Sequence, residues 1–161
     1  MTEQCCKLLP ILLTLRRIRS GRASEKALQF DEVVLALREI PAGESVGYGA
    51  TWVATRRSSI ATIPIGYADG LSRQLGGRGH VLVRGHRAPL VGAVSMDMAM
   101  VDVTAIEPVR VRDEVVVMGA QEGPVARGVI GADEIAAAAD TIPWEVLTSI
   151  SRRVPRFYRE P

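Results

Sequence analysis

Residues 81–91 read VLVRGHRAPLV, and this stretch decides the predicted fold because two apolar segments flank the dipeptide Gly85-His86. A glycine in the first place of a two-residue loop suits a type II′ turn, which joins the strands of a β-hairpin. Other short apolar or alternating segments lie on both sides of the hairpin, at residues 33–37, 60–63, 96–102 and 114–118. Short strands at this spacing predict a mainly β fold, either a small β-barrel-like domain or a sandwich.

The helices are expected late in the chain. Gly131 is predicted to cap a helix over residues 132–139, and Thr141 is predicted to cap a second helix with Pro143 inside its start. We therefore expect one mainly β domain, a small β-barrel-like domain with one or two short late helices, over residues 32–161.

Residues 1–31 are interpreted as a separate N-terminal arm or linker that is helical or disordered. Leucines recur at helical spacing from residue 8, and residues 20–24 (SGRAS) then break the pattern. One interpretation is a helix on a membrane surface, and the favoured one is a flank that folds only against a neighbouring domain. The apolar run at residues 8–15 is about half of the roughly 20 residues that a membrane span needs.

Composition and charge argue against several classes of function. The 20 basic and 18 acidic side chains leave a net charge of +2, whereas a groove that neutralises phosphates needs a larger local excess. Aromatic residues make up 4%, too few for a platform that stacks single-stranded nucleic acid. The adjacent Cys5 and Cys6 suit neither an ordinary disulfide nor a metal site, which indicates the reducing cytoplasm. We expect no nucleic-acid, membrane or metal partner.

Two tyrosines lie in glycine-rich turns. Tyr48 lies in VGYGATW, residues 46–52, and Tyr67 lies in PIGYADG, residues 64–70. The glycines let the backbone take unusual angles or approach a ligand closely, and a phenol so placed can act as an acid or a base. The alternative, which spacing alone favours, is that each ring packs at a strand end with its hydroxyl in water.

A set of ordered segments carries a resemblance to a known family. These segments are residues 41–52 (PAGESVGYGATW), 63–70 (IPIGYADG), 87–92 (RAPLVG), 95–97 (SMD), 100–103 (MVDV), 141–143 (TIP) and 153–156 (RVPR). Together they span about residues 32–158, and in this order they resemble the C-terminal β-domain of the alanine racemase family.

The resemblance implies an isomerase that uses pyridoxal 5′-phosphate to interconvert L-alanine and D-alanine, the latter for peptidoglycan. Members of the family join this β-domain to an N-terminal (β/α)8 barrel, which carries the Schiff-base lysine and the cofactor, and they work as head-to-tail dimers. The implied partners are therefore alanine as substrate and a barrel domain on a partner subunit or separate chain, in a homo-oligomer.

The resemblance also implies residue roles by position. Tyr48 corresponds to the base that acts on the α-proton of L-alanine. Met96 corresponds to a residue that binds the substrate carboxylate through its backbone. Tyr67, Arg73 and Ile142 correspond to positions that line the substrate entrance.

Three departures from the family pattern bear on the expected function. Trp144 stands where the family has a tyrosine whose hydroxyl contacts the cofactor phosphate, and an indole can donate only from its N–H. Neither lysine, Lys7 or Lys26, has the context of the Schiff-base lysine, so we expect the chain alone to be inactive. The first 30 residues match nothing in the family pattern.

Two other functions stay open. One is a non-catalytic dimerisation or binding module, derived from the racemase β-domain, that pairs with a separate barrel protein. The other is an unrelated small β-barrel whose basic arm binds RNA. The lack of a lysine in the right context argues against self-sufficient catalysis, and the modest charge and few aromatic residues argue against RNA.

Overall fold

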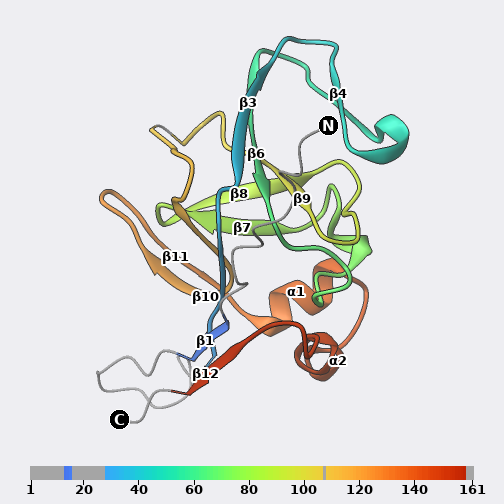
Figure 1. Cartoon of the computed structure of the whole chain (residues 1–161). Coiled ribbons are helices and arrows are strands. Elements are labelled where there is room, and N and C mark those ends of the chain that lie inside the picture. Colours follow the sequence, from blue (N-terminus) through green and yellow to red (C-terminus); the bar gives the residue numbers. More distant parts are fainter. Residues whose placement is uncertain (1–12, 16–27, 107, 159–161) are drawn as a thin grey trace, which may run out of the picture.

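A computed structural model describes residues 13–15, 28–106 and 108–158, and its main feature is an antiparallel sheet (Figure 1). The strands of this sheet follow the order β11-β10-β7-β8-β9-β6-β3, and β2 also pairs with β10. The strands are β1 (Leu13–Leu15), β2 (Phe30–Val33), β3 (Ala36–Ile40), β4 (Ser45–Val46), β5 (Trp52–Val53), β6 (Ser58–Ile63), β7 (His80–Val83), β8 (His86–Val91), β9 (Ala99–Asp102), β10 (Glu114–Glu122), β11 (Arg127–Ile130) and β12 (Arg156–Tyr158). The helices are the 3-10 turns η1 (Tyr48–Ala50) and η2 (Arg73–Leu75) and the α-helices α1 (Ala132–Ala138) and α2 (Pro143–Ser149). The prediction of a mainly β fold with short late helices is confirmed.

The sheet is open, which corrects the expectation of a barrel-like closure. In the part of the chain that the structure describes, β11 and β3 end the strand order and do not pair with each other. β11 leads directly into α1, whose Ile135 packs into the main apolar core. A helix therefore follows at the edge where a closing strand would be needed.

The β7–β8 hairpin forms as predicted, but its turn lies one residue earlier than expected. Val83 pairs with His86, so Arg84 and Gly85 form the loop. Both loop residues have positive φ, +54° at Arg84 and +81° at Gly85, which is the pattern of a type I′ turn and not of type II′. Type I′ matches the right-handed twist of the flanking strands equally well.

The predicted strand at residues 33–37 is divided between β2 and β3. The amide of Val34 donates to the carbonyl oxygen of Asp113 at 2.9 Å, whereas the amide of Leu35 donates to that of Thr62 at 2.8 Å. The chain therefore passes at this point from the β10 side of the sheet to the β6 side.

Only part of the predicted N-terminal arm can be compared with the structure. Leu13–Leu15 form β1, which pairs in parallel with β12. β2 already begins at Phe30, two residues before the predicted start of the domain. The remainder of the arm, residues 1–12 and 16–27, lies outside the described residues.

Two apolar clusters stabilise the fold. The main one fills the sheet with fully buried aliphatic side chains, the largest being Ile63, Ile65, Leu82, Leu90, Ile130, Val34, Val81, Val83, Val101, Val103 and Val115. Burying one such side chain contributes about 1.5–3 kcal/mol. The smaller cluster contains Val46, Ile60 and Val91, with Trp52 packed against it, and it lies beneath the β4–β5 hairpin.

One of the two α-helices begins with the predicted cap residue and the other does not. Gly131 precedes α1 as expected, without a side-chain cap. The residue that caps α2 is Ile142 and not Thr141, whose hydroxyl instead donates to the Glu145 carboxylate. Pro143 occupies the first helical position, where its missing N–H costs nothing. No helix in the described ranges is long and apolar enough to span a membrane.

An ion pair fastens α1 to the sheet. Arg87 of β8 donates from Nη2 to Glu134 Oε2 at 2.8 Å and to the carbonyl oxygen of Val129 at 2.8 Å. The hydrogen bond from Arg87 holds the pKa of Glu134 below its ordinary value. This contact fixes the position of α1, the helix that precedes Ile142 and Trp144 in the chain.

Candidate functional site

Tyr48 lies at the tip of a short hairpin formed by β4, η1 and β5, called here the Tyr48 hairpin. Gly47 and Gly49 on either side have φ of +78° and +74°, values that a side chain would strain. Val46 and Trp52 pair across the hairpin and anchor its base in the smaller apolar cluster. The Tyr48 side chain itself is 77% exposed, so its ring does not pack at the strand end as the alternative interpretation requires.

The Tyr48 hairpin is seated on the loop that follows β8. A β-carbon on Gly47 would lie 3.0 Å from the amide nitrogen of Ala93, so the two backbones touch. Gly92 faces Val46 in the same contact and has a φ of +69°. The position of Tyr48 is therefore set by glycine-to-backbone contacts with residues 92–93.

Met96 lies in a tight turn, residues 95–98, called here the Met96 turn, where a strand had been predicted. The Ser95 amide donates to the carbonyl oxygen of Met98 at 2.9 Å, and the Met98 amide donates to Ser95 Oγ at 3.1 Å. These bonds compete with the strand ladder, so β9 begins only at Ala99. Met96 is 51% exposed, and its own N–H makes no hydrogen bond within the described part of the chain.

Tyr67 lies in a second turn, residues 66–70, called here the Tyr67 turn, which rests on the Met96 turn. The amide of Tyr67 donates to Ser95 O at 3.0 Å, and the amide of Ala68 donates to Met96 O at 3.0 Å. A β-carbon on Gly66 would lie 2.3 Å from each of these two carbonyl oxygens, so only glycine permits this approach. The structure thus brings Tyr67 and Met96 onto adjoining turns.

Arg73 and the start of α2 form a pocket beside Tyr67. The Arg73 guanidinium carbon lies 5.9 Å from the centre of the Tyr67 ring, within cation–π range. The pocket has a volume of about 410 Å³ and is lined by Tyr67, Gly70, Ser72, Arg73, Gln74, Ile135, Ala139, Asp140, Thr141, Glu145, Val146 and Ser149. Ile142 and Trp144 flank it in sequence without lining it, and they are 59% and 73% exposed.

The six predicted residues do not converge in one cavity. Tyr67 and Arg73 line the pocket, and Met96 adjoins it through the backbone of its turn. In Figure 1 the cyan Tyr48 hairpin projects from the sheet well away from α2, which carries Trp144. The two ends of the predicted site therefore face outward from different parts of the domain.

Exposure is the property that the predicted residues share. Five of the six, all but Arg73, are large apolar or aromatic side chains that remain exposed. Exposed apolar side chains of this size commonly mark a surface that another molecule covers. The arrangement presents a phenol, a free backbone N–H and aromatic rings to such a partner.

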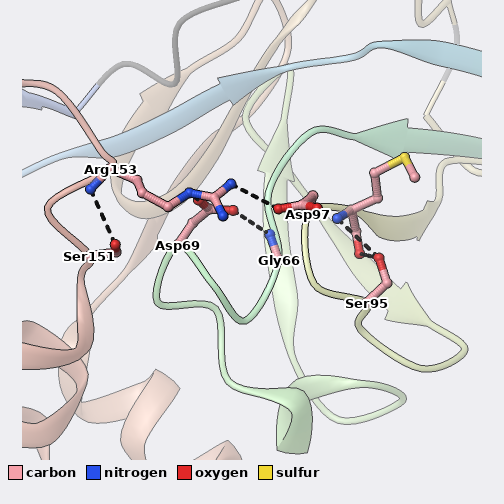
Figure 2. A network of polar contacts seen from close by, with 7 residues as sticks. Gly66, Asp69, Ser95, Asp97, Ser151 and Arg153 are labelled. Carbon is pink, nitrogen blue, oxygen red and sulfur yellow. Dashed lines mark hydrogen bonds and ion pairs between the residues drawn. The ribbon is translucent and has the colours of Figure 1, made fainter. Parts of the chain in front are cut away.

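Sequence reasoning missed a network of charges behind these turns (Figure 2). Arg153 Nη2 donates to Asp97 Oδ1 at 2.8 Å, and Arg153 Nε lies 3.2 Å from Asp69 Oδ1. Asp69 is fully buried, and its Oδ2 accepts the amide of Gly66 at 3.0 Å. The hydrogen bond with Asp97 and the charge of Asp69 raise the pKa of Arg153. The signal was available, because three of the quoted segments (IPIGYADG, SMD and RVPR) each contribute one of these charges.

A second buried acid lies near this network. Glu32 of β2 is 5% exposed, and its Oε1 has no hydrogen-bond partner among the described residues. Burial, and to a lesser degree the charges of Asp31 and Asp69, raise the pKa of Glu32 to about 8. No group of three or more histidine, cysteine or acidic residues in the described ranges is arranged to hold a metal ion.

Comparison with known sequences identifies relatives over nearly the whole chain. A family model described as the C-terminal domain of alanine racemase matches residues 27–158. The chain is 56% identical over 157 residues to the alanine racemase of Sorangium cellulosum, a match that covers 98% of this chain and 38% of that protein. It is 51% identical over 132 residues to alanine racemase 2 of Caldanaerobacter subterraneus, covering 82% of this chain and 33% of that protein.

Solved structures agree with these sequence matches. The biosynthetic alanine racemase of Pseudomonas aeruginosa superposes with a TM-score of 0.76 at 41% identity, over 84% of this chain and 36% of that one. The alanine racemase of Bartonella henselae, crystallised with covalently bound pyridoxal phosphate, gives 0.75 at 35% identity, over 86% and 38%. The chain thus spans less than two fifths of the length of the relatives it matches.

The match to the Sorangium cellulosum protein also corrects one expectation. Because it covers 98% of this chain, it includes most of residues 1–31, which had been taken to match nothing in the family. The N-terminal stretch carries none of the short glycine-rich segments by which the rest of the domain was identified, so pattern alone did not reveal it.

Proposed function

This chain belongs to the alanine racemase family, whose C-terminal domain it represents, and from this premise we propose that it serves as the β-domain of a pyridoxal-phosphate-dependent interconversion of L-alanine and D-alanine. The observation that supports this most directly is the presentation of Tyr48. Its phenol stands 77% exposed between two glycines of positive φ, at the tip of a hairpin whose base is anchored. Such a side chain is built to enter a site on another domain.

In this proposal Tyr48 accepts the α-proton of L-alanine at its phenolate oxygen, and a second acid on the partner barrel would protonate the opposite face to give D-alanine. In the reverse direction, from D-alanine to L-alanine, Tyr48 donates its proton to the face from which it would take one. Phenols ordinarily titrate near pH 10, so a phenol that works as a base at neutral pH requires a positive charge beside it. The described residues place no hydrogen-bond partner or ring contact on Tyr48. The activating charge must therefore come from the domain that Tyr48 enters.

The described residues do not fit pyridoxal phosphate as a self-contained site. Covalent attachment of the cofactor needs a lysine amine, and the two lysines of the sequence, Lys7 and Lys26, lie outside the described residues. When bound on a partner barrel, the cofactor withdraws electrons from the α-carbon. This chain would face it with the exposed indole N–H of Trp144, a donor suited to a phosphate oxygen.

The other predicted residues would bind and admit the substrate. The unpaired N–H of Met96 is free to donate to a carboxylate oxygen. Arg73 places a positive charge beside the Tyr67 ring at the pocket, which would attract the carboxylate of an amino acid. Tyr67 and Ile142 would form the apolar edges of that entrance, and their size would favour a small side chain on the substrate.

The proposal is tested with a chimera in which residues 27–161 replace the C-terminal domain of the Sorangium cellulosum alanine racemase, called here the barrel chimera. L-alanine is incubated with pyridoxal phosphate and either the barrel chimera or the 161-residue chain, and the enantiomers are resolved. We expect D-alanine from the barrel chimera and none above the cofactor blank from the chain alone. A barrel chimera that assembles into a dimer without racemising would instead favour the non-catalytic dimerisation module.

A further inference from the structure

Three segments that are distant in the sequence meet at the guanidinium group of Arg153. The residue follows α2, and it reaches Asp69 in the Tyr67 turn and Asp97 in the Met96 turn (Figure 2). Its own amide donates to Ser151 Oγ at 3.2 Å, and the amide of Ser151 donates to Asp69 O at 3.1 Å. The side chain is therefore held at its base as well as at its tip.

The two carboxylates that Arg153 contacts differ in their burial and in their role. Asp69 is fully buried, and its second oxygen fixes the amide of Gly66. A buried carboxylate without a compensating charge is costly, and the Arg153 guanidinium supplies a positive charge beside Asp69. Asp97, by contrast, is 48% exposed and stands next to Met96 at the outer end of its turn. Its contact with Arg153 is not required for burial and serves to restrain the turn.

The restraint acts on the atoms that the proposed function uses. Inside the contact, the two turns are joined by the hydrogen bonds from Tyr67 to Ser95 and from Ala68 to Met96. Apart from these backbone hydrogen bonds, the bond between Arg153 and Asp97 is the one that ties the Met96 turn to another segment among the described residues. A turn fastened on one side can tilt, and one fastened on both sides cannot.

We infer that Arg153 is a positioning residue, which clamps the Tyr67 turn and the Met96 turn together through Asp69 and Asp97 and thereby fixes the direction of the Met96 N–H toward a substrate carboxylate. The substrate part of this inference rests on the proposed function, and the clamp itself does not. Arg153 acts through Met96 and touches no reacting atom.

The clamp is tested first in the 161-residue chain by amide hydrogen exchange. The variants are D97N, R153K and R153M, and the matched control is R152M, which removes a neighbouring arginine that has no ion pair among the described residues. In D97N we expect the Ala68 amide to exchange faster by roughly 1.4- to fivefold, the range that exposed ion pairs typically give. The Val101 amide in β9 should keep its rate, and R152M should change neither amide.

The outcomes are distinguishable even if one variant is unstable. R153K keeps the charge and should give an intermediate rate at Ala68, whereas R153M should give the fastest. If R153M also speeds amide exchange at Val101, this variant has destabilised the whole domain. The clamp is then judged from D97N alone, because Asp97 is exposed and its replacement should leave the fold intact. An unchanged Ala68 rate in D97N overturns the clamp.

The consequence for substrate is tested in the barrel chimera. A carboxylate contact made equally in the ground state and the transition state affects KM and leaves kcat unchanged. We expect D97N to raise the KM for L-alanine by up to roughly fivefold, with kcat unchanged, and R152M to change neither. A fall in kcat alone overturns the positioning role. An inactive wild-type chimera refutes the proposed function, and the exchange rates then still decide whether the clamp exists.

Discussion

A β-carbon on Gly92 would lie 2.5 Å from the carbonyl oxygen of Val46, so the strand that leads into Tyr48 rests directly on the loop that leads to Met96. The contact has no side chain in it and depends on the φ of +69° at Gly92. It couples two turns that the sequence separates widely, and the position of Tyr48 follows from it.

Replacing Gly92 by alanine should therefore destabilise the domain more than the backbone angle alone explains. The matched control is G77A, at a φ of +74° with nothing within 4 Å of the added carbon. We expect G77A to lose about 1–2 kcal/mol of unfolding free energy from strain, and G92A to lose at least about 1 kcal/mol more. Urea unfolding followed by tryptophan fluorescence measures both, and equal losses would contradict the close contact.

Removing the Tyr48 hydroxyl should nearly abolish racemisation in the barrel chimera. Y48F keeps the ring and its exposure and deletes only the group that accepts the proton. Loss of a general base is worth about 10²–10⁴ in rate. The control is V125A, at a side chain that is 89% exposed in the loop between β10 and β11. A Y48F chimera with most of its activity would show that Tyr48 serves another purpose.

Glu32 makes the stability of the domain depend on pH. Its pKa is about 8 in the folded chain against 4.5 as the ordinary value, so the folded state holds the proton more tightly than the unfolded state. The resulting stabilisation is complete below about pH 4.5 and is lost as the pH rises toward 8, with a slope of up to about 1.4 kcal/mol per pH unit.

The substitution E32Q should flatten that slope, because glutamine fills the same space and does not titrate. Urea unfolding at several values between pH 5 and pH 8 gives the free energies, with E122Q as the control at an exposed carboxylate. We expect E32Q to be the more stable protein at pH 8. A wild-type slope in E32Q would assign the pH dependence to other groups.

With Trp144, the barrel chimera should bind the cofactor more weakly than it would with a tyrosine at position 144. Pro143 restricts the backbone just before it, which limits how the indole can be aimed at a phosphate. A hydrogen bond to a charged group contributes about 1.5–3 kcal/mol, so W144Y in the barrel chimera should bind pyridoxal phosphate more tightly by roughly one to two decades. Equilibrium titration measures the affinity, and equal affinities of W144Y and the unchanged chimera would contradict the expected benefit of a tyrosine hydroxyl at this position.

Local sequence patterns predicted a strand correctly where the backbone conformation is the one that its residue types favour. The β7–β8 hairpin was found because glycine and two apolar runs mark it, yet its turn was misplaced by one residue. Arg84 takes a φ of +54°, which arginine rarely adopts, and nothing local to the sequence indicates it. The alternating methionines suggested a strand through Met96, and the bonds from Ser95 to Met98 replaced its first part by a turn.

The site was predictable only as far as its residues are neighbours in sequence. The glycines around Tyr48 and Tyr67 identify exposed turns, and the structure places both side chains outside the core. Arg153 and Asp97 are 56 residues apart, and their pairing depends on how the Tyr67 turn packs on the Met96 turn. Charges that meet only after the sheet has formed leave no periodic signal in the chain.

The pairing of β2 with β10 has a consequence for how the domain assembles during synthesis. Glu32 lies opposite Val115, so the first strand of the sheet emerges from the ribosome long before the strand that completes its hydrogen bonds. Contacts this distant in sequence slow folding and leave strand edges available in the meantime. The Tyr48 hairpin has strands only a few residues apart, but residues 92–93, on which it is seated, are synthesised only after β8. An isolated two-stranded hairpin is marginally stable, so the phenol-bearing tip reaches its final position only once translation has passed residue 93.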